Sequence, residues 1–132
     1  MTAETLFIVN PISGTGKQKR INAILQKSLD YSRFNPTIVL TERSGHATEL
    51  SHNAIGKYEY VIAVGGDGTV NEVARGLVGS NTVMGIIPVG SGNGLARHLN
   101  IPMNTTQAVK TLNKLLIKPI DTLKINDQVS VN

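Results

Sequence analysis

The sequence contains no cysteine and no tryptophan, and it has few aromatic residues of any kind. Without cysteine the chain has no disulfide framework, no thiolate metal site and no cysteine nucleophile. Because only three tyrosines and two phenylalanines are present, the 40% apolar fraction must form a mostly aliphatic core. A length of 132 residues fits one domain of ordinary size.

Long apolar runs and aromatic-rich basic runs are also missing. No segment reaches the roughly 18 apolar residues of a transmembrane helix, and the first residues lack the features of a signal peptide. The net charge of +4 comes without a basic run interleaved with aromatic residues, so we expect no nucleic-acid partner. We expect a cytoplasmic protein. Two alternatives stay open: peripheral contact of its basic first helix with the inner membrane face, and a homodimer.

Short apolar segments alternate with segments of helical periodicity. Strands are expected over 5–10, 37–42, 60–65 and 82–90, and helices over 17–31, 46–56, 69–78, 94–99 and 104–116. This alternation predicts a Rossmann-like three-layer α/β domain, with a mostly parallel sheet covered by helices on both faces. The tail, 120–132, alternates apolar residues around Asn126 and Asp127, which predicts a β-hairpin.

Three glycine-rich segments each follow an expected strand and precede an expected helix. They are NPISGTGK (10–17), GGDGTVNE (65–72) and GSGNG (90–94). The carboxyl ends of parallel strands meet at the edge where open α/β sheets bind ligands. Glycine lets backbone N–H groups approach a ligand, and a helix N-terminus attracts anions. One such turn could be only a tight connection, but three in register favour a phosphate site.

The spacing of these turns does not match the common nucleotide and hydrolase motifs. The Walker pattern fails because Pro11 stands at its first glycine and Gln18 at its Ser/Thr. The dinucleotide fingerprint fails when counted from Gly66 or from Gly90. A nucleophile elbow at Ser91 lacks its flanking glycines.

The polar residues of the second turn suggest specific roles. Asp67 could accept backbone N–H bonds, bind a ribose hydroxyl or hold a metal ion with its water. Thr69 and Glu72 fit the T-x-x-E pattern of a helix N-cap and its capping-box partner, with ligand contact as the alternative for Glu72. The three histidines are scattered, so we expect no histidine metal site.

Four segments together resemble the catalytic domain of diacylglycerol kinases and related lipid kinases, including bacterial members and the sphingosine and ceramide kinases. They are NPISGTGK, TERSGHATEL, GGDGTVNEV and GIIPVGSGNGLARHLNIP, which occur in the family order over about residues 5–125. The resemblance implies an α/β nucleotide-binding domain akin to those of NAD kinases and 6-phosphofructokinases. It also implies ATP and Mg²⁺, bound in a cleft against a second, β-rich domain. We therefore expect the nucleotide-binding domain over 1–119 and the first strands of the second domain over 120–132.

The resemblance also implies which residues contact the nucleotide. The turn 10–14 would hold phosphate, Lys17 would help, Thr41 would line the nucleotide pocket, and 65–71 would wrap the phosphates and ribose. Ser91 would hydrogen-bond the nucleotide. The full set of expected contacts is Asn10, Pro11, Ser13, Gly14, Lys17, Thr41, Gly65, Gly66, Asp67, Gly68, Thr69, Asn71, Glu72, Ser91, Gly92 and Asn93.

The sequence departs from the bacterial pattern in its third turn. Ser91 replaces a threonine and keeps the hydroxyl, whereas Gly94 replaces an aspartate, which leaves the lipid acceptor open. The family's general base is a carboxylate of the second domain. We therefore expect an ATP-dependent lipid kinase domain, transferring phosphate to diacylglycerol or a related lipid, that is inactive alone. The alternatives are an NAD kinase-like or other soluble-substrate kinase and a non-catalytic nucleotide-binding module.

Overall fold

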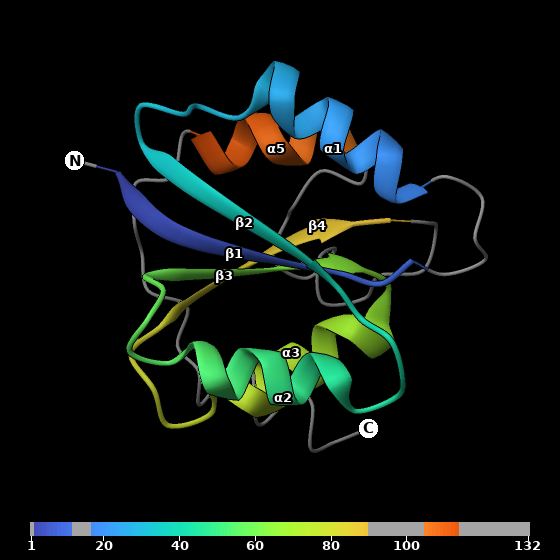
Figure 1. Cartoon of the computed structure of the whole chain (residues 1–132), viewed down its shortest axis with the longest axis vertical. Helices are drawn as coiled ribbons and strands as arrows, with labels where there is room; N and C mark the ends of the chain where they lie inside the picture. Colours follow the sequence, from blue (N-terminus) through green and yellow to red (C-terminus); the bar gives the residue numbers. More distant parts are fainter. Residues whose placement is uncertain (1, 12–16, 90–104, 114–132) are drawn as a thin grey trace.

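The four described strands form one parallel sheet between two layers of helices (Figure 1). The computed structural model describes residues 2–11, 17–89 and 105–113. The strands are β1 (Ala3–Val9), β2 (Phe34–Leu40), β3 (Tyr60–Gly65) and β4 (Val83–Pro88), in the order β2-β1-β3-β4. The helices are α1 (Lys17–Ser28), α2 (His46–Ala54), α3 (Asp67–Leu77) and α5 (Thr105–Asn113). The predicted parallel three-layer α/β fold is confirmed.

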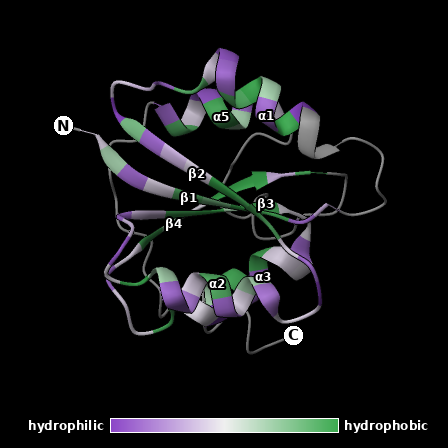
Figure 2. Cartoon of the chain, viewed as in Figure 1, coloured by the Kyte–Doolittle hydropathy of each residue, from purple (hydrophilic) through white to green (hydrophobic). Residues whose placement is uncertain are grey.

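Each face of the sheet has its own aliphatic core. Alternate residues of β1 point to opposite faces, so Leu6 and Ile8 pack toward α2 and α3, while Phe7 and Val9 pack toward α1 and α5. Residues 6–9 of β1 and 61–64 of β3 are all apolar and buried, and Figure 2 shows the middle of the sheet as hydrophobic. This is the pattern expected of a parallel sheet covered on both faces.

Several element boundaries differ from the prediction. Helix α1 ends at Ser28 rather than 31, because Asp30 starts a turn in which its carboxylate accepts the Ser32 N–H at 2.9 Å. Strand β2 begins three residues earlier than expected, at the buried Phe34. The expected helix at 94–99, the hairpin at 120–132 and the domain boundary at 119 lie outside the described residues.

Strand β2 pairs only with β1 among the described strands, and Pro36 lies in its middle. The Ala3 N–H donates to Arg33 O, and the Thr41 N–H donates to Val9 O, so the odd-numbered residues of β2 bond to β1. Alternate residues of a strand direct their backbone groups to opposite sides. The nitrogen of Pro36 therefore faces away from β1, and its missing N–H costs no bond to that strand.

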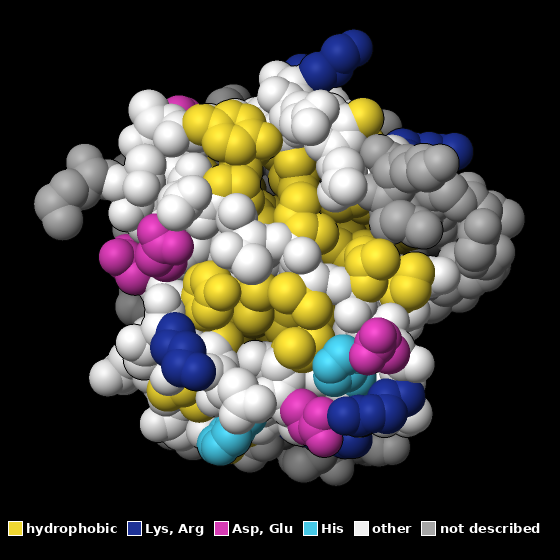
Figure 3. All heavy atoms as spheres, in the orientation of Figure 1, with side chains coloured by type: hydrophobic (Ala, Val, Ile, Leu, Met, Phe, Trp, Pro, Cys, Tyr) yellow, Lys and Arg dark blue, Asp and Glu magenta, His cyan; other side chains and the backbone are white. Residues whose placement is uncertain are grey.

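Strand β2 and the turn before it carry partly exposed apolar side chains. Ile38 is 37% and Leu40 is 38% exposed, beside Tyr31 at 46%. Apolar side chains gather in the middle of the face shown in Figure 3, where β2 lies in the same view of Figure 1. No helix in the described part of the chain is long and apolar enough to cross a membrane.

Helices α2 and α3 pack closely enough to require a glycine at their crossing. A Cβ on Gly76 would lie 1.8 Å from Ser51 Oγ and 2.5 Å from Thr48 O. The Thr48 hydroxyl donates to the backbone oxygen of Glu72 at 2.9 Å, which joins the two helices directly. This packing fixes the position of α3, whose first turn lies at the carboxyl edge of the sheet.

Candidate functional site

The carboxyl ends of the two central strands lie side by side at the topological switch point of the sheet. The helix after β1 covers one face, while the helix after β3 covers the other (Figure 1). Open α/β sheets bind ligands in the crevice at this point. Asn10 continues the ladder by donating its N–H to Val64 O at 3.1 Å, so the turn after β1 begins from a fixed position.

A side-chain hydrogen bond joins the turn after β1 to the first turn of α3. Asn10 Nδ2 donates to Thr69 Oγ1 at 3.1 Å, and Thr69 is only 4% exposed. Two residues predicted from separate motifs, 59 positions apart, are therefore in direct contact.

The predicted capping box is wrong. Helix α3 begins at Asp67 with Gly66 as its N-cap, so Thr69 lies inside the first turn. The Thr69 hydroxyl accepts from Asn10 instead, and the backbone oxygen of Glu72 accepts from Thr48. The Glu72 side chain is half-buried and faces a pocket described below.

The glycines of this turn do not share one structural cause. A Cβ on Gly65 would lie 2.8 Å from Thr69 Oγ1, so close packing explains that glycine. Gly66 has ordinary extended backbone angles, φ −93° and ψ −165°. A Cβ on Gly66 or on Gly68 would meet no described atom within 4 Å. Neither conformation nor packing within the described part of the chain requires these two glycines, and their lack of side chains leaves the start of α3 bare.

A polar pocket of about 390 Å³ opens beside the start of α3. It is lined by Asn10, Pro11, Thr41, Glu42, Arg43, Ser44, Ala47, Thr69 and Glu72. The structure thus brings five predicted site residues into one lining: Asn10, Pro11, Thr41, Thr69 and Glu72. The predicted residues Gly66, Asp67, Gly68 and Asn71 lie on the start of α3 outside that lining.

Four pocket residues were not predicted: Glu42, Arg43, Ser44 and Ala47. Ala47 belongs to α2, whereas the other three follow the carboxyl end of β2, just as the predicted turns follow the ends of other strands. Their turn is not glycine-rich, because Gly45 is its only glycine. Position after a strand of a parallel sheet was the signal that could have found them.

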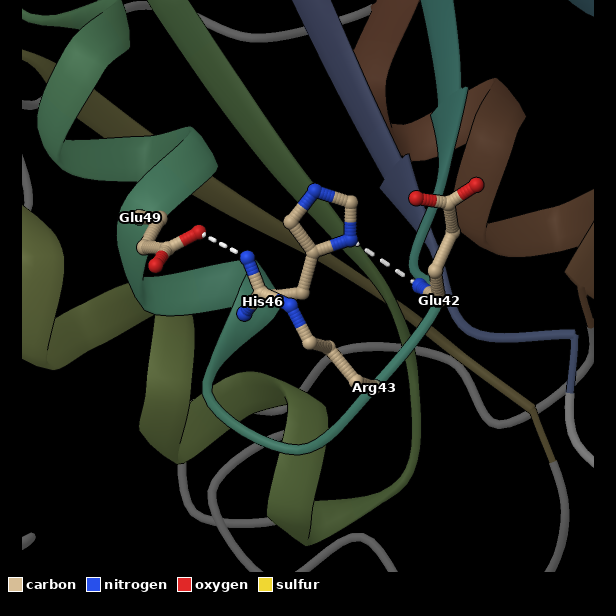
Figure 4. A network of polar contacts seen from close by, with 4 residues as sticks. All are labelled: Glu42, Arg43, His46 and Glu49. Atoms are coloured by element: carbon tan, nitrogen blue, oxygen red, sulfur yellow. Dashed lines mark hydrogen bonds and ion pairs between the residues drawn. The ribbon is translucent and has the colours of Figure 1, made fainter.

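The turn that carries these residues is closed by three contacts, two of which Figure 4 draws as dashed lines. The Glu42 N–H donates to His46 Nδ1 at 2.9 Å, and the His46 N–H donates to Arg43 O at 3.2 Å. Arg43 and Glu49 form an ion pair at 2.5 Å. The hydrogen bond and charge of Arg43 lower the pKa of the Glu49 carboxyl, and Glu49 raises the pKa of Arg43.

The other predicted residues fall partly outside the description. Ser13, Gly14, Ser91, Gly92 and Asn93 lie outside the described residues, as does the side chain of Lys17. Over the ranges that the structure covers, no group of three His, Asp or Glu residues is arranged to hold a metal ion.

Together, the parallel sheet, the polar pocket and the bare helix start define an α/β domain with a candidate ligand site at the carboxyl ends of its strands. A model of the diacylglycerol kinase catalytic domain matches residues 4–125. The chain belongs to this family, which confirms the resemblance read from its motifs.

Relatives and solved structures agree with this assignment. The chain is 33% identical over 130 residues to a diacylglycerol kinase of Bacillus subtilis, covering 96% of this chain and 43% of the relative. It is likewise 33% identical over 129 residues to a diacylglycerol kinase of Staphylococcus haemolyticus, covering 96% and 39%. A crystal structure of a diacylglycerol kinase from Bacillus anthracis superposes with a TM-score of 0.71 at 32% identity, covering 85% of this chain and 39% of that one. The chain spans less than half the length of each.

Proposed function

We propose that the chain is the nucleotide-binding part of an ATP-dependent lipid kinase, which transfers the γ-phosphate of ATP to a hydroxyl of diacylglycerol or a related lipid. The observation that carries the proposal is the bare start of α3 beside a polar pocket, in a chain of the diacylglycerol kinase catalytic family. We assign the general base to a second, β-rich domain, as the family resemblance implies.

The start of α3 is proposed to bind phosphate. The first N–H groups of a helix have no partner within the helix, and the helix dipole adds positive potential at this end. With no side chain at Gly66 or Gly68, a phosphate oxygen can approach these groups closely.

Asp67, an exposed carboxylate in the same turn, is proposed as a ligand of Mg²⁺. A carboxylate beside phosphate oxygens is repulsive unless a positive charge lies between them. Mg²⁺ is commonly held by one or two carboxylates together with substrate phosphates and water, and Asp67 fits that donor set. We therefore infer that Asp67 organises Mg²⁺ and nucleotide and does not act as the base.

The pocket is proposed to hold the uncharged part of the nucleotide. Its lining has two carboxylates, Glu42 and Glu72, and one guanidinium, Arg43, so it is not a site for a multiply charged anion. Hydroxyl, amide and carboxylate groups in such a lining suit the hydroxyls of a ribose and the polar edge of a base. The pocket and the start of α3 share Thr69, which would bring the two halves of one ligand together.

Calorimetry with ATP and Mg²⁺ tests the proposal. Asp67→Asn should weaken binding about tenfold in the presence of Mg²⁺, about the size of one charge-assisted contact, and should differ little from wild type when EDTA is added. Glu59→Gln is the matched control, because it removes an exposed acid at the amino end of β3. Equal binding by wild type and Asp67→Asn would remove Asp67 from the site. No binding of ATP by the wild type would refute nucleotide binding by this chain.

A second experiment tests the acceptor. A protein in which this chain is joined to the part of a relative that the chain does not cover would be incubated with radiolabelled ATP, diacylglycerol vesicles and NAD. Label in the organic phase supports the lipid kinase, whereas label on NAD alone would replace it with a soluble-substrate kinase.

A further inference from the structure

The turn between β2 and α2 forms one wall of the pocket, and few contacts from the described residues hold it in place. Glu42, Arg43 and Ser44 are all exposed and all line the pocket. Thr41 anchors the start of the turn through the bond of its N–H to Val9 O at 2.9 Å. The end of the turn is fixed where α2 begins, at His46. Between these anchors, the described contacts of the wall are one backbone bond, from the His46 N–H to Arg43 O, and the side-chain contacts that His46 makes with Glu42 and Glu49 makes with Arg43.

The contact between Glu42 and His46 requires a neutral imidazole. A backbone N–H can only donate, so Nδ1 of His46 must accept at the observed 2.9 Å (Figure 4). The proton of the neutral ring is then on Nε2. A protonated imidazole carries a proton on both nitrogens, which would set two donors against each other. The contact cannot survive protonation of His46.

The other contacts of the turn do not replace this one. The Arg43–Glu49 pair has both side chains 57% exposed, and exposed ion pairs contribute little to stability. The bond from the His46 N–H to Arg43 O, at 3.2 Å, positions Arg43 but makes no contact with Glu42. Loss of the imidazole acceptor would therefore release the Glu42 side of the wall.

We propose that His46 is a positioning residue of the pocket: when neutral it holds the Glu42–Ser44 wall in place, and when protonated it releases that wall and weakens nucleotide binding. The ligand in this statement rests on the proposed function, whereas the hold of His46 on the turn does not.

The charged groups near His46 belong to the turn and to two helices. Glu42, Arg43 and Glu49 lie around it in Figure 4, and Glu72 of α3 lines the same pocket. An imidazole is ordinarily neutral at about pH 8 and protonated at about pH 5.5. We therefore expect the wall to be held at the higher pH and released at the lower one.

Two substitutions separate this role from a general structural one. In His46→Asn, the side-chain oxygen can take the place of Nδ1 as an acceptor, but it does not titrate. His46→Ala removes the acceptor at every pH. His52→Asn is the matched control, because His52 is an exposed histidine later in the same helix.

Nucleotide affinity would be measured for the wild type and the three variants at about pH 8 and about pH 5.5. The loss of affinity of the wild type between the two pH values is divided by the loss of His46→Asn. This ratio removes the effect of protonating the phosphates of the nucleotide, which is the same for both proteins. We expect the wild type to lose about fivefold more affinity than His46→Asn, roughly the worth of one ordinary hydrogen bond. His46→Ala should be weak at both pH values, and His52→Asn should follow the wild type. Equal pH dependence in wild type and His46→Asn would overturn the proposal.

A second readout does not need the nucleotide. In ¹⁵N–¹H spectra of the unliganded wild type, the Glu42 amide should shift with the same midpoint as the His46 ring, and it should stay constant in His46→Asn. A chemical shift of the Glu42 amide that stays constant while the His46 ring titrates would also overturn the proposal. Failure of the wild type to bind ATP would refute the proposed function instead, and the amide titration would still decide whether His46 holds the turn.

Discussion

Replacing Gly68 by alanine should make the protein more stable and a poorer nucleotide binder. Alanine is favoured over glycine inside a helix by up to about 1 kcal/mol, and Gly68 is the second residue of α3. A Cβ there would meet no described atom within 4 Å, so no overpacking opposes the gain. We expect about 0.5–1 kcal/mol of added stability, because the first turn restrains the backbone less than the helix interior does.

The same methyl group should interfere with the ligand. If phosphate binds at the start of α3, the added Cβ lies on the bare surface through which it approaches. Loss of one hydrogen bond to a charged group costs about 1.5–3 kcal/mol, which corresponds to a loss of tenfold or more in affinity. Stability and binding should therefore change in opposite directions.

The assays are urea unfolding followed by circular dichroism without nucleotide, and calorimetry with ATP and Mg²⁺. Gly65→Ala is the contrasting variant: its Cβ would lie 2.9 Å from Thr69 Cβ, so it should lose both stability and binding. A Gly68→Ala protein with raised stability and wild-type affinity would refute a phosphate at this helix start. A destabilised one would show that Gly68 has a structural cause after all.

Two further predictions concern the helices around the site. Gly76→Ala should destabilise the protein by about 1–3 kcal/mol or more, measured by urea unfolding, since its Cβ would lie 2.5 Å from Thr48 O. Adding Ser51→Ala should recover only part of the loss, because that backbone oxygen remains; full recovery would contradict the packing argument. For Glu49, the pKa of the carboxyl is lowered in the folded state by Arg43, so its contribution to stability is present at neutral pH and is lost as the pH falls through the folded-state pKa. Glu49→Gln should therefore be slightly less stable than wild type at about pH 7 and indistinguishable from it at about pH 3, and an equal difference at both would contradict the pairing.

The sequence predicted the architecture well, because the apolar runs of its strands and the helical spacing of apolar residues in its helices are both strong. The apolar runs of β1 and β3 and the striped faces of α2 and α3 are separated by glycine-containing turns, and parallel pairing follows from their alternation. Boundaries were harder to place, since competing local bonds decide them. The start of α3 is an example: a T-x-x-E pattern suggested Thr69 as the cap, but the hydroxyl of that residue bonds to Asn10 across the sheet edge.

The parts of the candidate site that lie in glycine-rich turns, after β1 and β3, could be predicted from the sequence. Asn10 and Thr69 were both expected there, but their mutual bond depends on tertiary packing that no local pattern encodes. The wall of Glu42, Arg43 and Ser44 went unpredicted, because its only signal is its position after a strand, and which strand ends meet α3 depends on the strand order.

Pro36 has a consequence for the behaviour of the protein at high concentration. A strand at the side of a sheet, with aliphatic side chains such as Ile38 and Leu40 exposed, is a template on which other chains can add strands and aggregate. The nitrogen of Pro36 faces the side of β2 on which no described strand pairs, so a strand added there would find a donor missing in the middle of the row. Pro36 therefore disfavours aggregation through this side of β2, and it removes no hydrogen bond between β2 and β1.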